Sequence, residues 1–181
     1  YRGYDAVGLT NTNTYEDVAS LIINDDLDGE LFKKSFSNHY KKLSEDSGLI
    51  ELINRLKTEQ HPMDVTRTAI SYIGEANESN KLDAASKVTA IACLAIASYN
   101  KESSDVLDQK YTVASSLLPN SSTEQQLEAL DDMLILYAEH GFNASTFAAR
   151  VTASTRSDLI SAIVSGVGTL KGELHGGANE A

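Results

Sequence analysis

The chain has 181 residues, a formal net charge of −11, and 41% hydrophobic residues. This length suits one domain with a core of its own. The negative charge argues against nucleic acid or an anionic membrane surface as a partner, because either would repel the protein. A single cysteine, Cys93, excludes an intrachain disulfide and favours a reducing, cytoplasmic location.

The two ends of the sequence suggest that the chain is a piece of a longer protein. It opens on Tyr1 rather than methionine, and it stops at Ala181 a few residues into a motif. No signal peptide opens the chain, and we find no run of about 18 apolar residues to span a bilayer. We therefore expect a trimmed chain with no membrane partner.

Long segments rich in alanine, leucine, glutamate and lysine predict an all-α fold, because only two prolines and few glycines interrupt them. No alternating strand pattern competes with this, although the first few residues allow an extended segment. The expected helices run, in chain order, over about 14–24, 29–44, 49–56, from 62 onward, 80–99, 122–139, 144–154 and 158–170.

Three of these helices carry specific expectations. In the second, Leu31, Phe32, Phe36 and Tyr40 should face inward. The helix that begins near 122 should start with a capping box of Ser122 and Gln125. Its apolar segment 133–138 should be buried on both sides, and the last helix should present a face of small residues.

Two histidines stand beside helix boundaries near the end of the chain. His175 precedes two glycines, which would let the backbone approach a ligand closely, and a helix can start at about 178. The positive end of that helix would favour a neutral imidazole, which can donate a hydrogen bond to a developing enolate. His140 ends one helix, and Asn143 can cap the next. Either histidine taken alone is better explained as a structural residue.

The two histidine blocks together resemble the citrate synthase family. The segments that carry the resemblance are 139–151 (EHGFNASTFAARV) and 171–181 (KGELHGGANEA), supported by 1–5 (YRGYD) and 61–64 (HPMD) in the same order. The resemblance covers essentially the whole chain and is similar for citrate synthases and 2-methylcitrate synthases. It implies the all-α, multi-helical large domain of such an enzyme, with residues 1–181 as a partial domain that lacks the small domain.

The resemblance also implies a reaction, the condensation of acetyl-CoA, or propionyl-CoA in the methylcitrate branch, with oxaloacetate. Coenzyme A enters as the thioester substrate, and no cofactor is expected. His175 matches the catalytic histidine that hydrogen-bonds the thioester carbonyl, and His140 matches a histidine that holds oxaloacetate. The matching aspartate base, a second catalytic histidine and the carboxylate-binding arginines fall beyond the sequence, so we expect the isolated chain to be inactive.

The family's homodimer interface corresponds to the helices near 122–139 and 144–154, so we expect a homodimer. A non-catalytic helical interaction domain remains the alternative, although it does not account for both histidine blocks. The remaining candidates are interpreted as structural: an exposed His39, a helix-start role for His61, an ion pair for Arg67, and an inert core thiol for Cys93. A metal site built on His140 and His175 is rejected, because neither a helical ligand pair nor a cysteine accompanies them.

Overall fold

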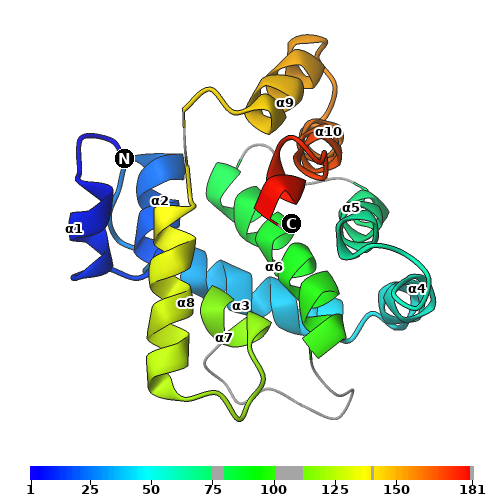
Figure 1. The fold of residues 1–181 in the computed structure, drawn as a ribbon, viewed down its shortest axis with the longest axis horizontal. Coiled ribbons are helices and arrows are strands. Elements are labelled where there is room, and N and C mark those ends of the chain that lie inside the picture. Colours follow the sequence, from blue (N-terminus) through cyan, green and yellow to red (C-terminus); the bar gives the residue numbers. More distant parts are fainter. Residues whose placement is uncertain (75–79, 101–111, 140, 180–181) are drawn as a thin grey trace.

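A computed structural model describes residues 1–74, 80–100, 112–139 and 141–179, and these ranges contain helices and no strand. The all-α prediction is therefore confirmed (Figure 1). The α-helices are α1 (Ala6–Thr10), α2 (Tyr15–Asn24), α3 (Glu30–Ser44), α4 (Ser47–Leu56), α5 (Pro62–Tyr72), α6 (Lys81–Asn100), α7 (Val113–Leu117), α8 (Glu124–Leu136), α9 (Ala144–Ser154) and α10 (Leu159–Leu170). A 3₁₀ turn, η1 (Gly176–Asn179), follows α10.

Polar caps set the starts of most helices. Thr14 and Asp17 form a capping box at α2, in which each side chain accepts from the other residue's backbone N–H. Proline occupies the first position of α5, where its missing N–H costs nothing, and His61 caps that helix as expected. The capping box of α8 is formed by Thr123 and Gln126. The expected box at Ser122 and Gln125 is therefore wrong by one residue.

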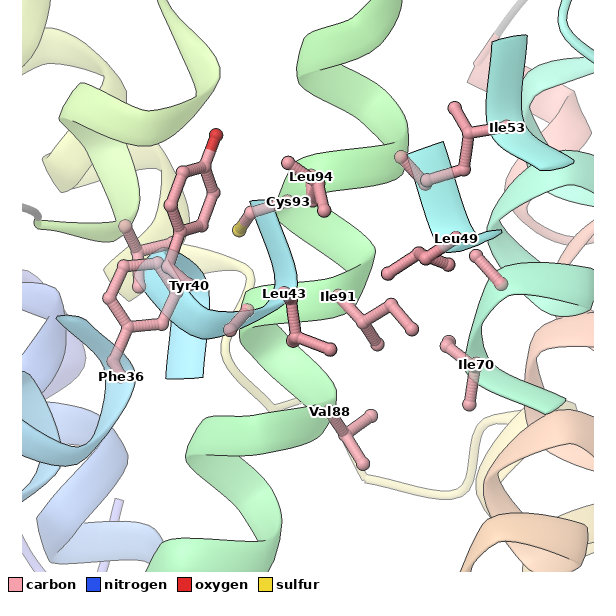
Figure 2. Close-up of a cluster of buried hydrophobic side chains, with 14 of the residues drawn as sticks. Phe36, Tyr40, Leu43, Leu49, Ile53, Ile70, Val88, Ile91, Cys93 and Leu94 are labelled. Carbon is pink, nitrogen blue, oxygen red and sulfur yellow. The ribbon is translucent and has the colours of Figure 1, made fainter. Parts of the chain in front are cut away.

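Helix α6 forms the centre of the main core, with α3 and α5 packed along its sides (Figure 1). Buried side chains from α3, α4, α5 and α6 meet there, and Figure 2 shows Tyr40, Leu49, Ile70 and Ile91 among them. By length and composition α6 also qualifies as a membrane span, contrary to our reading of the sequence. Its burial among the other helices accounts for its apolar composition.

A second, smaller core joins the start of the chain to α8. Leu9, Val18 and Leu21 from α1 and α2 surround Ile135, which is fully buried. The Tyr1 hydroxyl donates to the carbonyl oxygens of Ile135 and Leu136, at 2.8 and 3.0 Å. The N-terminus is therefore fastened to the C-terminal end of α8.

Two burial expectations are wrong. Leu31 is 69% exposed. Phe32 and Phe36 are four positions apart and share the buried face of α3, and Leu31, one position before Phe32, lies off that face. On α8 only Ile135 is buried, since the helix packs on one side against α1, α2 and α7. Segment 133–138, which we expected to be buried on both sides, therefore has one face exposed to solvent.

The remaining residues singled out in the sequence, His39, Arg67 and Cys93, have structural roles in polar pairs or in the core. His39 is not an exposed histidine: its Nε2 lies 2.9 Å from Asp83 Oδ1, across the α3–α6 contact. The expected ion pair of Arg67 is present, with Asp64 at 3.0 Å. Cys93 is buried in the main core, as expected.

Candidate active site

The site is built on the first turn of α9, whose start is set by the Asn143 side chain. Its Oδ1 accepts from the backbone N–H of Thr146 at 2.6 Å and from the Ser145 hydroxyl at 2.8 Å. The preceding residue, Phe142, has a φ of 62°, a left-handed conformation that is uncommon for a bulky residue and costs roughly 1–2 kcal/mol. This turn thus directs Asn143 back onto α9.

Helix α10 packs closely against this first turn. A Cβ added to Gly166 would lie 3.4 Å from the carbonyl oxygen of Ser145 and 3.6 Å from the Ala149 Cβ. A larger side chain at 166 would push the two helices apart. The contact with the part of α9 that forms the site is therefore made at Gly166, and not on the small-residue face expected at Ser161, Ser165 and Gly168, whose Gly168 lies beside Arg67 of α5.

The turn after α10 carries His175 and folds back on the helix end. The backbone N–H groups of His175 and Gly177 both donate to the Gly172 carbonyl, at 2.9 and 3.2 Å. A Cβ at Gly176 would lie 2.5 Å from the carbonyl oxygen of Leu170, so only glycine fits there. The first glycine after His175 therefore permits a close approach to the protein's own backbone.

The His175 imidazole points at the N-terminus of α9. Its Nε2 lies 3.3 Å from the backbone nitrogen of Ser145 and 3.0 Å from that residue's hydroxyl oxygen. A backbone N–H can only donate, so its bond to Nε2 corresponds to the tautomer protonated on Nδ1, in which the Ser145 hydroxyl also donates to Nε2. When that hydroxyl instead donates to Asn143 Oδ1, its oxygen accepts from Nε2–H. In either tautomer a neutral ring carries one N–H donor.

Both histidine blocks of the sequence therefore contribute to one place, with His175 from the second and Ser145 from the first. His140 itself lies outside the described residues, as does Glu180. Sequence reasoning missed Ser145, although it stands in the quoted block at the second position of α9. The signal that could have identified Ser145 is a polar residue two positions after a capping asparagine.

An ion-pair cluster joins the His175 turn to α5. Lys171 Nζ lies 2.5 Å from Asp64 Oδ2, and Arg67 Nη2 lies 3.0 Å from Asp64 Oδ1. The hydrogen bond from Lys171 is the main reason that the pKa of the Asp64 carboxyl is below its usual range. Asp64 is the aspartate of the segment HPMD, which the resemblance had included without a role.

An open pocket of about 560 Å³ lies elsewhere, between the 10–14 loop and α8, and His175 and Ser145 are not among its lining residues. Glu16 and Asp131 line it together. Burial raises the pKa of Glu16, and burial together with the nearby Glu16 raises that of Asp131 to about 6. Each carboxylate accepts a backbone N–H: Glu16 from Val113 at 2.7 Å and Asp131 from Tyr15 at 3.0 Å.

Within the described part of the chain, no three His, Cys, Asp or Glu side chains are grouped as metal ligands would be. A neutral imidazole at His175 would give the site one N–H donor. Such a donor stabilises negative charge that develops on an oxygen in a transition state.

Comparisons with known proteins identify the family of the chain. The family model described as "Citrate synthase, C-terminal domain" matches residues 1–181. The 2-methylcitrate synthase 2 of Corynebacterium glutamicum is 37% identical over 203 residues, with 99% of this chain and 52% of that protein covered. The citrate synthase of Mycolicibacterium smegmatis is 35% identical over 196 residues, with 100% and 52% covered. The chain thus spans about half the length of the curated relatives it matches.

Solved structures give the same result. The crystal structure of citrate synthase from Thermotoga maritima superposes with a TM-score of 0.79 at 29% identity, covering 99% of this chain and 51% of that one. The citrate synthase of Thermoplasma acidophilum, solved as a ternary complex with carboxymethyl coenzyme A and oxaloacetate, has a TM-score of 0.78 at 22% identity, with 98% and 51% covered. That second likeness shows the fold alone. Since the family model covers every residue, the chain belongs to the citrate synthase family.

Proposed function

We propose that this chain supplies the thioester-activating part of an enzyme that condenses an acyl-CoA with oxaloacetate. The observation that carries the proposal is the hydrogen bond from the Ser145 backbone N–H to His175 Nε2. In the tautomer that this bond requires, the ring proton is on Nδ1, where it would donate to the thioester carbonyl as the α-proton departs and an enolate forms. Donation from a neutral ring stabilises the enolate oxygen without first transferring a proton to it.

The proposal assigns two further tasks to groups that the described residues do not include. His140 holds oxaloacetate, so that its keto carbon meets the enolate carbon. An aspartate base outside these 181 residues removes the α-proton, within an intact protein in which this chain is part of the large helical domain. Coenzyme A enters as the acyl thioester and leaves as the free thiol when water hydrolyses the thioester of the condensed product, with no resident cofactor. We place the reaction in the cytoplasm.

For the acyl group, we propose acetyl-CoA and citrate as the first assignment. The alternative is propionyl-CoA and 2-methylcitrate, favoured by the relatives of that name at 35–37% identity. A steady-state comparison of kcat/KM for the two thioesters in the intact protein would decide between them. A preference of at least about tenfold, equivalent to about 1.4 kcal/mol in transition-state binding, would assign the substrate.

We also propose that the protein works as a homodimer. Large apolar side chains are exposed at the end of α8 and along α9, and α9 has no buried residue in the described chain. They are Met133, Leu136, Tyr137, Phe147 and Val151. Several large apolar side chains exposed on neighbouring helices of the sequence are unusual in a soluble monomer, and a second copy would cover them.

The test of the reaction is CoA release by the intact protein with oxaloacetate and each thioester. His175→Ala should lower kcat by about 10²-fold or more, as loss of a transition-state donor does, with little change in oxaloacetate affinity. His140→Ala should chiefly weaken oxaloacetate binding, measured by calorimetry. Equal affinity losses in the two variants would contradict this division of roles.

The isolated 181-residue chain provides the matching negative result. Without a general base, which typically contributes ~10²–10⁴-fold, it should show no turnover above background. Turnover by the isolated chain, free of longer protein, would contradict the proposed placement of the base. An intact protein that neither binds oxaloacetate nor releases CoA would instead support a non-catalytic helical interaction domain.

A further inference from the structure

The turn that carries His175 is anchored to a helix far away in the sequence. Lys171, the C-cap residue of α10, extends its ammonium to Asp64 in the first turn of α5, and the two residues are 107 positions apart. Asp64 is well shielded, with 19% of its side chain exposed. Such a charge-assisted contact is shorter and stronger than one between neutral groups.

Asp64 is held in place from several sides. Its other carboxylate oxygen accepts from Arg67 at 3.0 Å, so both oxygens face a cation. It occupies the third position of α5, where the positive end of the helix dipole favours a carboxylate. Arg67 also lies along α10, since its Nη1 is 3.6 Å from the position that a Cβ on Gly168 would take. The carboxylate therefore forms a fixed point between α5 and α10.

The backbone transmits the position of Lys171 to His175. Gly172, the next residue, donates to Thr169 and accepts from both His175 and Gly177. A displacement of Lys171 therefore moves the carbonyl on which the whole turn depends. At its other end the turn is held by the contact of His175 with Ser145 on α9.

We infer that Asp64 and Lys171 are positioning residues for His175, and that their ion pair sets the distance of its imidazole from the N-terminus of α9. Neither side chain takes part in the chemistry. The catalytic consequence rests on the function proposed above, whereas the placement of the imidazole can be measured without any substrate.

The first measurement is spectroscopic. In the intact protein, long-range ¹H–¹⁵N spectra with ¹⁵N-labelled histidine, assigned through His175→Gln, should show one neutral tautomer protonated on Nδ1. Lys171→Met keeps the length of the side chain and removes its charge, and Asp64→Asn keeps its shape and removes its charge. In both variants the His175 signals should change to a mixture of tautomers. Lys171→Arg, which retains the positive charge, should show the single His175 tautomer of the wild type.

The second measurement is kinetic. The same two variants should lower kcat by about tenfold or more, since a misplacement of about 1 Å can cost ~10²-fold, with the KM for oxaloacetate within about twofold of wild type. Lys57→Met is the matched control, because Lys57 also makes one long-range bond, to the Ser98 carbonyl at 2.8 Å, away from the turn. It should leave both the His175 signals and kcat unchanged.

The outcomes separate the two proposals. If the intact wild-type protein does not condense the substrates, the proposed function fails, and the spectra still decide the role of the ion pair. Unchanged His175 signals in both Asp64→Asn and Lys171→Met would overturn the inference, as would the same spectral change in Lys57→Met. If Lys171→Met does not fold, judged by circular dichroism, the Asp64→Asn spectrum decides.

Discussion

Replacing Asp131 with asparagine should stabilise the folded chain at neutral pH, and this gain should disappear in mild acid. Asp131 lies on α8 beside Glu16, and burial together with that second carboxylate raises its pKa to about 6. Its Oδ2 accepts from the Tyr15 backbone N–H at 3.0 Å. Asparagine retains an oxygen for this bond, and its helix propensity is close to that of aspartate.

The magnitude follows from the pKa difference between the folded and unfolded states. An unfolded aspartate titrates near 3.9, so a rise of about two units corresponds to about 3 kcal/mol against the folded state at pH 7. The side chain is only half-buried, and solvent screening reduces this to about 1–1.5 kcal/mol. The melting temperature of a chain of this length should then rise by about 3–5 °C.

The sign of the pH dependence is specific. Between pH 4 and pH 6 the folded state binds more protons at Asp131 than the unfolded state, so this carboxyl makes the wild type more stable as the pH falls through 6. Asp131→Asn lacks this carboxyl, so its free energy of unfolding does not rise from protonation at position 131. Its advantage should therefore be full above about pH 7 and small at pH 4.5.

Urea unfolding at pH 4.5 and pH 7.5 measures both free energies. Glu128→Gln is the control, because Glu128 lines the same pocket from an exposed position and its replacement makes the same change in net charge. An equal gain in both Asp131→Asn and Glu128→Gln would show that the effect is general charge relief. A gain that persists undiminished at pH 4.5 would refute the titration argument.

Three further outcomes can be checked on the same chain or the intact protein. Phe147→Glu should convert a dimer to a monomer in sedimentation velocity without loss of helicity, because Phe147 is 71% exposed in one copy. Leu134→Glu should instead lower the free energy of unfolding, because Leu134 packs on the main core. A dimer that survives Phe147→Glu would contradict the proposed interface. Gly176→Ala should displace the His175 turn, visible as changed histidine side-chain NMR signals, and unchanged signals would refute the clash with the helix end. Thr14→Ala should cost about 1 kcal/mol in urea unfolding, and no loss would show that the capping box does not stabilise α2.

Most helices were predictable because their starts depend on neighbouring residues. Thr14, Pro62, Asn143 and Asp158 each satisfy backbone N–H groups within the next turn or fit the first helical position, so short sequence windows contain the necessary information. The short helix α7 was missed although Thr112 and Ser115 form a local capping box, because five residues are too few to show a helical period. Its first N–H donates to Glu16, far away in the chain.

Burial and pairing were harder to predict, since they depend on which helices meet. The pattern of α3 does not say whether Leu31 or Phe32 points inward; contact with the other helices selects Phe32. The pairs of His39 with Asp83 and of Lys171 with Asp64 join positions 44 and 107 residues apart. Nothing local distinguishes these side chains from ordinary surface charges.

His175 shows that the helix end beside a residue can belong to a different helix from the one that local sequence suggests. The sequence suggested that the helix starting after His175 would favour its neutral form, yet that segment is a short 3₁₀ turn. The helix end that meets the imidazole belongs to α9, and Ser145 makes the contact. The two histidine blocks are therefore one structural unit, because the first supplies the helix start that the imidazole of the second contacts. A substitution that shifts the Asn143 cap should then alter the chemistry of His175 without touching it.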